Sequence, residues 1–589
     1  MALPIEDYAV LGDTATAALV GRNGSVDWLC LPRFDSPACF AALLGTPEHG
    51  RWLIGPEGPA RTTRRYRDDS LVLETTHGTD TGVVKVTDLM PLRDGRADIL
   101  RRVVGISGTV RMQHQWVVRF GYGKVRPWVR RRLDGSGNEV ISAVAGPDMV
   151  VLRGARLPRA VDGRHEDEFD VHEGEELTFS TTWSPSHKPV PVAVDVDRQI
   201  AETMALSEDW FARCDYTGPY RAAVTRSLLV LRLLTHGGTG GIVAAPTTSL
   251  PEDFGGSRNW DYRFCWLRDA SLTVKALLAS GFDQETRLWR GWLLRAIAGD
   301  PEDMQIMYAV DGARDLPERE LTHLPGYADS RPVRIGNAAV DQRQTDVLGE
   351  VMVALEAARQ AGIRDSADSW ALQRTLVEDL EQHWQQPDSG IWEIRGERQH
   401  FTHSRVMVWA AFDRAVAAVE RHGLDGPVER WRALREEVRQ EVLTRGYDSD
   451  RGTFTQHYDT KEVDASLLLI PTVGFLPPDD PRVLGTIQAV EEDLMHEGLM
   501  LRYRTGSGED GLTGDEHPFL ACSFWLVSAY AGAGRREEAH TLMKHLVSLS
   551  TDLGLMAEEY DPVRERMVGN FPQAFSHLAL IGAAVTLGA

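Results

Sequence analysis

The hydrophobic pattern of this chain changes its period near residue 196, and this change constrains the fold more than any other feature. Before it, short runs such as Ser70–Thr76 and Glu175–Trp183 are rich in Val, Leu, Thr and aromatic residues, which is typical of β-strands. After it, apolar residues recur every three or four positions, as in amphipathic helices. The sequence therefore predicts a β-domain followed by a helical domain, and 589 residues are enough for both.

The β-region has the closely spaced turns that are typical of a β-sandwich. Turn dipeptides such as Asn23-Gly24 and Asp134-Gly135 separate many short predicted strands. Prolines at 185, 189 and 191 then mark a boundary, because proline disrupts both helix interiors and central strands. We expect an N-terminal β-sandwich over residues 1–195, a linker helix over 196–217 and an all-α domain over 218–589.

The helical region predicts two layers. Residues 519–533 are apolar almost all round, as a fully buried helix requires, whereas the segment from Arg535 is charged at its start and apolar on one side only. A buried helix followed by a half-exposed one implies an inner and an outer layer. We therefore predict an (α/α)6 barrel. A superhelical repeat solenoid is the rival fold, but no fixed-period self-similarity supports it.

The formal net charge of −22 disfavours nucleic acid and anionic membrane surfaces as partners. No stretch approaches the roughly 20 apolar residues of a membrane span, and the first residues lack the pattern of a signal peptide. We expect a cytoplasmic protein that binds a small neutral ligand, with no nucleic acid and no membrane as partner. Whether it forms a homo-oligomer stays open.

No metal or cofactor is expected. Gly237–Gly241 lacks the lysine of a phosphate loop, and the loop from Asp448 has Thr453 where a calcium-binding EF-hand needs glycine. The cysteines are odd in number and contain no C-x-x-C pair, which indicates neither a disulfide framework nor a zinc site. They stand at Cys30, Cys39, Cys214, Cys265 and Cys522.

The segment Asn259–Asp269 is the first candidate site. It carries four aromatic residues among alternating charges, just before a helix predicted to begin near Ala270. Helix capping explains Asp269, because acidic residues favour helix N-termini, and it explains Arg268 as the partner of a nearby acid. Capping does not explain the aromatics, which suit a sugar-binding wall.

Two glutamates are candidates for acid and base chemistry. Glu393 follows Trp392 in a predicted extended piece, and an aromatic neighbour that removes water raises the pKa of a carboxyl group. Glu558 precedes a predicted helix for which Asn570 and Pro572 form a plausible cap. Glycosidic cleavage needs one carboxyl group as acid and another as base or nucleophile. Because the two are far apart in sequence, only a closed fold such as the barrel brings them together.

At these residues the sequence resembles glycoside hydrolase family 15, the glucoamylases, and most of all its bacterial members that include trehalases. The resemblance covers nearly the whole chain and implies a β-sandwich before an (α/α)6 barrel. Beyond the segments above it rests on residues 5–8, 24–30, 32–37, 331–337, 400–404, 464–469, 502–503 and 569–575.

The resemblance implies residue roles. Glu393 matches the general acid and Glu558 the general base of an inverting, exo-acting α-glucoside hydrolase that releases β-D-glucose from the non-reducing end. The matched substrate-binding residues are Tyr262, Trp266, Arg268, Asp269, Trp392 and Arg502. The family implies no cofactor.

Two departures bear on the substrate. Ile394 stands where fungal glucoamylases have a second acid that recognises substrate, and Glu559 replaces a glutamine after the base. The first departure weakens the case for starch-like chains. Trehalose is the best single substrate, with α-1,4 or α-1,6 glucosides as alternatives. A disaccharide phosphorylase and a non-catalytic sugar-binding protein are the rival classes.

Overall fold

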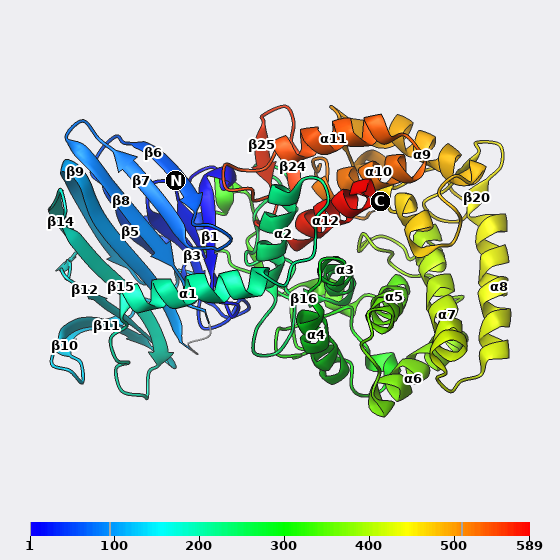
Figure 1. Cartoon of the computed structure of the whole chain (residues 1–589), viewed down its shortest axis with the longest axis horizontal. Coiled ribbons are helices and arrows are strands. Elements are labelled where there is room, and N and C mark those ends of the chain that lie inside the picture. The colour runs from blue at the N-terminus through cyan, green and yellow to red at the C-terminus, as the bar shows by residue number, and fades with distance from the viewer. Residues whose placement is uncertain (1, 93–95, 508–509, 589) are drawn as a thin grey trace.

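The computed structural model of the protein describes residues 2–92, 96–507 and 510–588. Two parts lie side by side along its longest axis (Figure 1). The part built from β1 to β15 ends at Pro185, and the part built from helices begins with α1 at Val196. The predicted order of a β-region and a helical region is confirmed.

The β-region is an antiparallel sandwich whose two layers share one long strand, β9 (Ala97–Val117). The first half of β9 pairs with β8 and β15, and the second half pairs with β5 and β14. A strand that changes sheets in this way forms a corner of the sandwich. One layer contains β1 (Tyr8–Gly12), β2 (Ala17–Gly21), β3 (Ser25–Cys30), β4 (Ala38–Phe40), β5 (Arg51–Pro56), β13 (Arg159–Val161) and β14 (Arg164–His172). The other contains β6 (Arg61–Tyr66), β7 (Leu73–Gly78), β8 (Gly82–Leu89), β10 (Trp128–Leu133), β11 (Glu139–Ala145), β12 (Asp148–Gly154) and β15 (Glu176–Pro185).

Aromatic side chains join the two layers. The ring of Phe179 on β15 lies 5.1 Å from that of His114 on β9 and 6.1 Å from that of Phe169 on β14. Phe179 is 1% exposed and belongs to a hydrophobic core that continues into the barrel. Side chains that point inward from the two layers therefore fill the space between them.

The helices form two concentric layers. The inner helices contact one another in a closed ring, in the order α3, α5, α7, η7, α10, α12 and back to α3. They are α3 (Leu267–Leu278), α5 (Asp346–Gln360), α7 (Thr402–His422), η7 (Ala465–Val473), α10 (Leu520–Gly532) and α12 (Ala574–Gly588). Around them lie α2 (Arg221–Leu234), α4 (Asp283–Ala296), α6 (Ala367–His383), α8 (Val428–Arg445), α9 (Pro481–Leu494) and α11 (Arg536–Ser548). The predicted (α/α)6 barrel is confirmed.

One inner element differs from an ideal barrel. Residues Ala465–Val473 form a 3₁₀ helix, η7, that contains Pro471. Proline has no N–H and its ring clashes with the preceding turn, so an α-helix is disfavoured there. Gly474, at φ 81°, ends the element in the left-handed region. The apolar residues of η7 still face the α7 and α10 neighbours and complete the ring.

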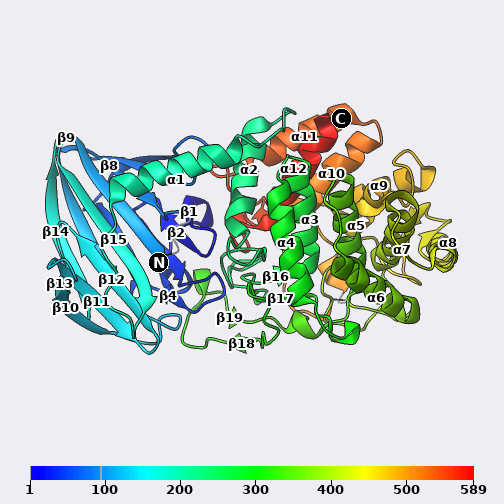
Figure 2. The ribbon, with the colours of Figure 1, turned by 60° about the horizontal axis from the view of Figure 1, so that its bottom comes forward.

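Helix α1 (Val196–Phe211) extends from the sandwich to the barrel (Figures 1 and 2). Near its start, Ile200 packs with Val72, Leu89 and Leu100 of the sandwich. Near its end, the Trp210 ring stacks on Phe282 with centroids 4.0 Å apart. The helix lies within the predicted linker of residues 196–217. The three-part domain division itself stays a prediction.

Short two-stranded ribbons occupy the connections between barrel helices. They are β16 (Cys265–Trp266) with β17 (Met307–Tyr308), β18 (Arg319–Glu320) with β19 (Arg334–Ile335), β20 (Tyr447–Asp448) with β21 (Thr453–Phe454), β22 (Met495–His496) with β23 (Leu499–Met500), and β24 (Glu559–Asp561) with β25 (Arg566–Val568). Among the helices of the described residues, none has the length and apolar character needed to cross a membrane.

Gly349→Ala tests the close packing of the inner ring. A Cβ atom at Gly349 on α5 would lie 2.2 Å from the Met407 carbonyl oxygen on α7, and a backbone atom cannot rotate aside. The two helices must separate, at a cost of about 1–3 kcal/mol. Gly582→Ala on α12 is the matched control, because nothing lies within 4 Å of its Cβ. Thermal unfolding should show a lower midpoint for Gly349→Ala and an unchanged or higher midpoint for Gly582→Ala. Equal midpoints for both variants would contradict the packing.

Candidate active site

A cavity opens at the rim of the barrel that carries the N-terminal ends of the inner helices. All the predicted site residues line it. They are Tyr262, Trp266, Arg268, Asp269, Trp392, Glu393, Arg502 and Glu558. Each stands in, or at the end of, a segment that leads into an inner helix, so the closed ring brings them together. The closed barrel therefore brings Glu393 and Glu558, which are far apart in sequence, to one cavity.

Glu393 occupies a turn rather than the extended piece predicted from the sequence. Its N–H donates to the Gly390 carbonyl at 3.2 Å, and its φ of 59° places it in the left-handed region. A glutamate in that region is strained, and such strain is characteristic of functional sites. The turn leaves the Glu393 side chain 22% exposed, facing the cavity.

Trp266, rather than the adjacent Trp392, contacts the Glu393 carboxyl group. Trp266 Nε1 donates to Glu393 Oε1 at 2.6 Å, and Arg268 Nη1 lies 3.7 Å from the same oxygen. Burial raises the pKa of Glu393, and Arg268 and the Trp266 hydrogen bond oppose that rise. Trp392 Nε1 instead donates to Asp464 at 2.9 Å, just before η7.

Helix α3 begins at Leu267, three residues before the predicted start, so Arg268 and Asp269 lie in its first turn. Arg268 Nε donates to Asp269 Oδ1 at 2.8 Å, and Arg268 Nη1 donates to the Ile391 carbonyl at 2.7 Å. The predicted pairing of Arg268 with a nearby acid is therefore present. This pair places a fixed donor and a fixed acceptor at the floor of the cavity.

Glu558 lines the same cavity and is 1% exposed. The Tyr262 hydroxyl donates to Glu558 Oε1 at 2.5 Å, and the Asn570 N–H donates to Oε2 at 3.4 Å. Burial and the nearby Glu252 carboxylate raise the pKa of Glu558 to about 8, while Arg502 and the Tyr262 hydrogen bond act in the opposite direction.

Asn570 does not cap the final helix as the sequence analysis expected. Helix α12 begins at Ala574, four residues later, and Pro572 follows a cis peptide bond outside the helix. The Asn570 side chain instead accepts a hydrogen bond from Thr247 at 2.8 Å and donates to the Trp260 carbonyl at 3.0 Å. It therefore ties the segment after Glu558 to the segment before α3.

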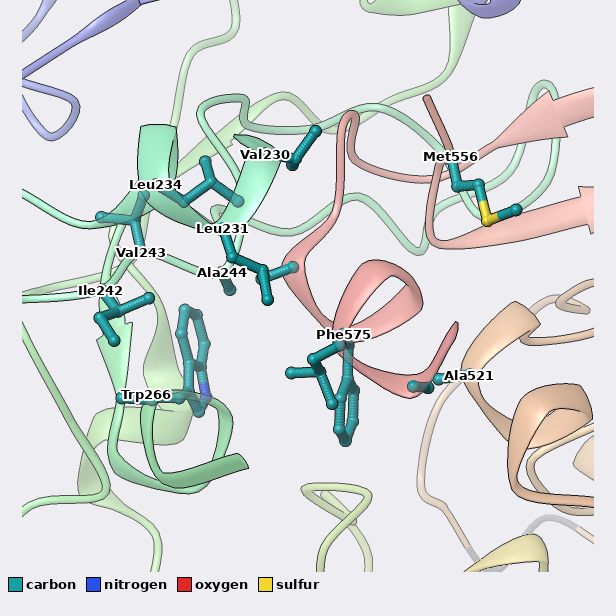
Figure 3. Packing of buried hydrophobic residues seen from close by; sticks show 14 of the residues in the cluster. Val230, Leu231, Leu234, Ile242, Val243, Ala244, Trp266, Ala521, Met556 and Phe575 are labelled. Atoms are coloured by element: carbon teal, nitrogen blue, oxygen red, sulfur yellow. The ribbon is translucent and has the colours of Figure 1, made fainter. Parts of the chain in front are cut away.

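Tyr262 and Trp266 connect the two glutamates. Their rings meet edge to face, with centroids 5.5 Å apart, and each donates a hydrogen bond to one carboxyl group. Trp266 also belongs to the buried hydrophobic cluster that contains Phe575 (Figure 3). A four-residue spacing in one segment thus fixes both carboxyl groups.

The same segment is anchored to the sandwich. Arg263 Nη2 pairs with Asp261 at 2.6 Å, and Arg263 Nη1 donates to the Ser36 carbonyl at 3.0 Å. Asp261 also accepts from the Gly336 N–H at 3.1 Å. Both charged side chains are at most 1% exposed. The position of Tyr262 therefore depends on contacts with the N-terminal domain.

A buried ionic network surrounds Arg502. Arg502 Nη2 lies 2.6 Å from Glu516, 3.1 Å from Glu252 and 3.5 Å from Glu559. Arg258 joins the network, since its Nη1 lies 3.3 Å from Glu516. Oxygen atoms of Glu252, Glu558 and Glu559 lie within 4.8 Å of one another, a spacing that a metal ion could bridge, but Arg502 already supplies positive charge there.

Several cavity residues are not predicted from the sequence. Trp260 lies in the segment Asn259–Asp269 and Phe575 in the motif at 569–575, but neither has a role assigned from the sequence, and Arg395 follows Glu393 by two residues. Glu252, in a loop with no motif, gave no signal. Its side chain accepts from Trp260 Nε1 at 3.1 Å and pairs with Arg502, so only the fold shows its place beside Glu558.

Comparison with known proteins gives a consistent result. Residues 218–585 match glycosyl hydrolases family 15, and residues 1–167 match a trehalase-like N-terminal domain. A trehalase of Mycobacterium tuberculosis is 38% identical over 99% of this chain and 89% of its own length. A trehalase of Thermoplasma acidophilum is 34% identical, covering 97% of this chain and 98% of its own. The fold is similar to that of a bacterial glucoamylase complexed with acarbose, with a TM-score of 0.74, 10% identity, and 99% and 95% of the two chains covered.

Glu559→Gln tests the charge balance of the buried network. Burial and Glu252 raise the pKa of Glu559 well above its usual value, although Arg502 opposes them. A carboxyl group with a raised folded-state pKa holds its proton more tightly when folded, so it costs stability as the pH rises above its unfolded value of about 4.3. The neutral amide avoids that cost.

We therefore expect Glu559→Gln to be more stable than the parent at pH 8, with a difference that shrinks toward pH 4. Denaturant unfolding at a series of pH values measures this. Glu516→Gln is the contrasting variant, because it removes the shared partner of Arg502 and Arg258 and should cost about 3–5 kcal/mol at neutral pH. A Glu559→Gln variant that is destabilised equally at both pH values would show that Glu559 is held ionised.

Proposed function

Because the chain belongs to glycosyl hydrolases family 15, we propose that it hydrolyses trehalose by an inverting mechanism, with Glu393 as the general acid and Glu558 as the general base. The chain is a glycoside hydrolase. The observation that carries the proposal is that two carboxyl groups line one cavity and that Tyr262 and Trp266, whose rings are in contact, each donate a hydrogen bond to one of them.

Glu393 has the environment that an acid needs. It must carry a proton before the reaction and deliver it to the glycosidic oxygen as the C–O bond breaks. Burial favours its protonated form. Once the proton has left, Trp266 Nε1 at 2.6 Å and the Arg268 guanidinium at 3.7 Å stabilise the carboxylate. Trp266 and Arg268 thus stabilise the carboxylate that the proton transfer leaves behind.

Glu558 has the environment of a base that is oriented by its neighbours. The Tyr262 hydroxyl and the Asn570 N–H hold its two oxygens. Burial and Glu252 raise its pKa, while Arg502 and the Tyr262 hydrogen bond favour the ionised form that a base needs. In the proposed step the carboxylate takes a proton from a water molecule, which attacks the anomeric carbon from the face opposite the leaving oxygen. The released glucose then has the β-configuration.

The floor of the cavity suits one neutral glucose unit. Arg268 and Asp269 place charged hydrogen-bonding groups beside each other, and Trp266, Trp392 and Phe575 provide apolar surface. Sugars present both kinds of surface. We assign hydroxyl recognition to Arg268, Asp269 and Arg502, and the apolar wall to the aromatic side chains.

The choice of trehalose draws support from relatives that carry that name and cover nearly the whole chain. Ile394 is 4% exposed and belongs to the core, so it offers no polar group to the substrate at the position where fungal glucoamylases have an acid. Exo-hydrolysis of α-1,4 or α-1,6 glucosides is the alternative, because it uses the same two carboxyl groups.

The acid and the base can be separated with two substrates. α-Glucosyl fluoride needs no protonated leaving group, whereas trehalose does. Glu393→Gln should lower kcat/KM for trehalose by about 10²–10⁴-fold and affect the fluoride much less. Glu558→Gln should impair both substrates strongly. Equal losses on both substrates in the two variants would contradict the assignment, and phosphate-dependent release of glucose 1-phosphate would identify a phosphorylase instead.

The acidic limb of the pH profile should shift in opposite directions in two variants. Activity requires ionised Glu558, so kcat/KM falls as the pH drops through the pKa of this group. Glu252 raises that pKa and the Tyr262 hydrogen bond lowers it. Glu252→Gln should therefore move the acidic limb to lower pH, and Tyr262→Phe should move it to higher pH. Shifts in the same direction would argue that another group sets this limb.

A further inference from the structure

Arg395 stands two residues after Glu393 and lines the same cavity, yet nothing in the proposed mechanism uses it. Ile394, between them, belongs to the hydrophobic core. The turn at Glu393 therefore sends residues 393 and 395 to the cavity and residue 394 away from it. The Arg395 side chain is 27% exposed, which leaves it accessible to a ligand.

The Arg395 guanidinium has a fixed position. Its Nη2 donates to Glu318 Oε2 at 2.9 Å, and it lies 4.3 Å from the centre of the Trp260 ring. Glu318 is itself held, because it accepts from the Ala338 N–H at 3.1 Å and lies 3.5 Å from Arg334. The Trp260 ring is held at its other end by the hydrogen bond from its Nε1 to Glu252. A guanidinium fixed by an acid and an aromatic ring is pre-organised for binding.

The backbone of residue 395 is fixed as well. The Arg395 N–H donates to the Asp510 carbonyl at 3.0 Å. Gly511 approaches so closely that a Cβ atom there would lie 2.9 Å from the Arg395 carbonyl carbon. Leu512, the next residue, lines the cavity. Arg395, Trp260 and Leu512 all line the cavity, and we refer to these three residues as the outer wall.

The outer wall lies where a leaving sugar would be recognised. A general acid must contact the glycosidic oxygen, so the leaving sugar passes beside Glu393 and away from the water held by Glu558. Arg395 belongs to the same turn as Glu393. Its hydrogen bonds to Glu318 involve Nη1 and Nη2 once each, out of five N–H groups on a guanidinium. The remaining N–H groups suit the hydroxyls of a sugar.

We propose that Arg395, positioned by Glu318 and Trp260, forms the subsite that recognises the leaving sugar of a disaccharide substrate. This inference rests on the proposed roles of Glu393 and Glu558. Arg395 binds the hydroxyl groups of a neutral hexose, and the Trp260 ring, which Arg334 also contacts at 4.6 Å, holds the Arg395 guanidinium in place. The subsite makes the enzyme favour a disaccharide over an α-glucoside that lacks a second sugar.

The test compares two substrates that share the glucosyl unit. Trehalose carries a leaving sugar, whereas α-glucosyl fluoride does not. For Arg395→Gln we expect kcat/KM for trehalose to fall about 10- to 100-fold relative to that for the fluoride, mainly through KM, since hydrogen bonds from a charged donor are lost. Arg395→Lys keeps the charge but not the planar fork and should recover part of the loss. Glu318→Gln should shift the ratio in the same direction by a smaller factor.

Arg398→Gln is the matched control, because this exposed arginine stands three residues further along the same loop and does not line the cavity. If the ratio of kcat/KM for trehalose to that for the fluoride is unchanged in both Arg395 variants, whether or not both values fall, the proposal is overturned. A parent enzyme that cleaves a different α-linked disaccharide but not trehalose would overturn the trehalose assignment alone, and the same ratio measured with that disaccharide would then decide the role of Arg395. A parent enzyme inactive on every α-glucoside, the fluoride included, would overturn both proposals.

Discussion

The hydrogen bonds from Tyr262 and Trp266 to Glu558 and Glu393 are the interactions on which the rest of the site depends. Two side chains of one short segment reach two carboxyl groups that are far apart in sequence, and the contact between their rings fixes the relation of one carboxyl group to the other. Each donor also stabilises the ionised form of the group it touches. The contacts that fix the positions of the two carboxyl groups therefore also oppose the rise in pKa that burial causes.

This constraint extends to both parts of the molecule. Asp261 and Arg263, inside the same segment, are buried and reach the Ser36 carbonyl of the sandwich. The ring of inner helices brings the segments of Glu393 and Glu558 to one rim. Beside Glu558, a network of glutamates shares the charge of Arg258 and Arg502, and this network contributes to the electric field at the Glu558 carboxyl group.

Much of this arrangement was predictable from the sequence. The hydrophobic periodicity distinguishes buried from half-exposed helices, and the motifs carry the residue types that the chemistry needs. The alternation of buried and half-exposed helices predicted the barrel, and the resemblance predicted every residue that was assigned to the cavity. Glu252 escaped because an isolated acid in a loop resembles a solvated one until the fold buries it. The turn at Glu393 and the contacts of Asn570 also escaped, since both depend on partners distant in sequence.

The anomers released from trehalose test the central claim most directly. Inversion converts the glucosyl unit to β-glucose, while the leaving unit keeps its α-configuration. Proton NMR in the first minutes of reaction, before mutarotation, should therefore show α- and β-glucose appearing in equal amounts. Release of α-glucose alone would require retention of configuration. It would contradict the account in which Glu558 activates water on the face opposite Glu393.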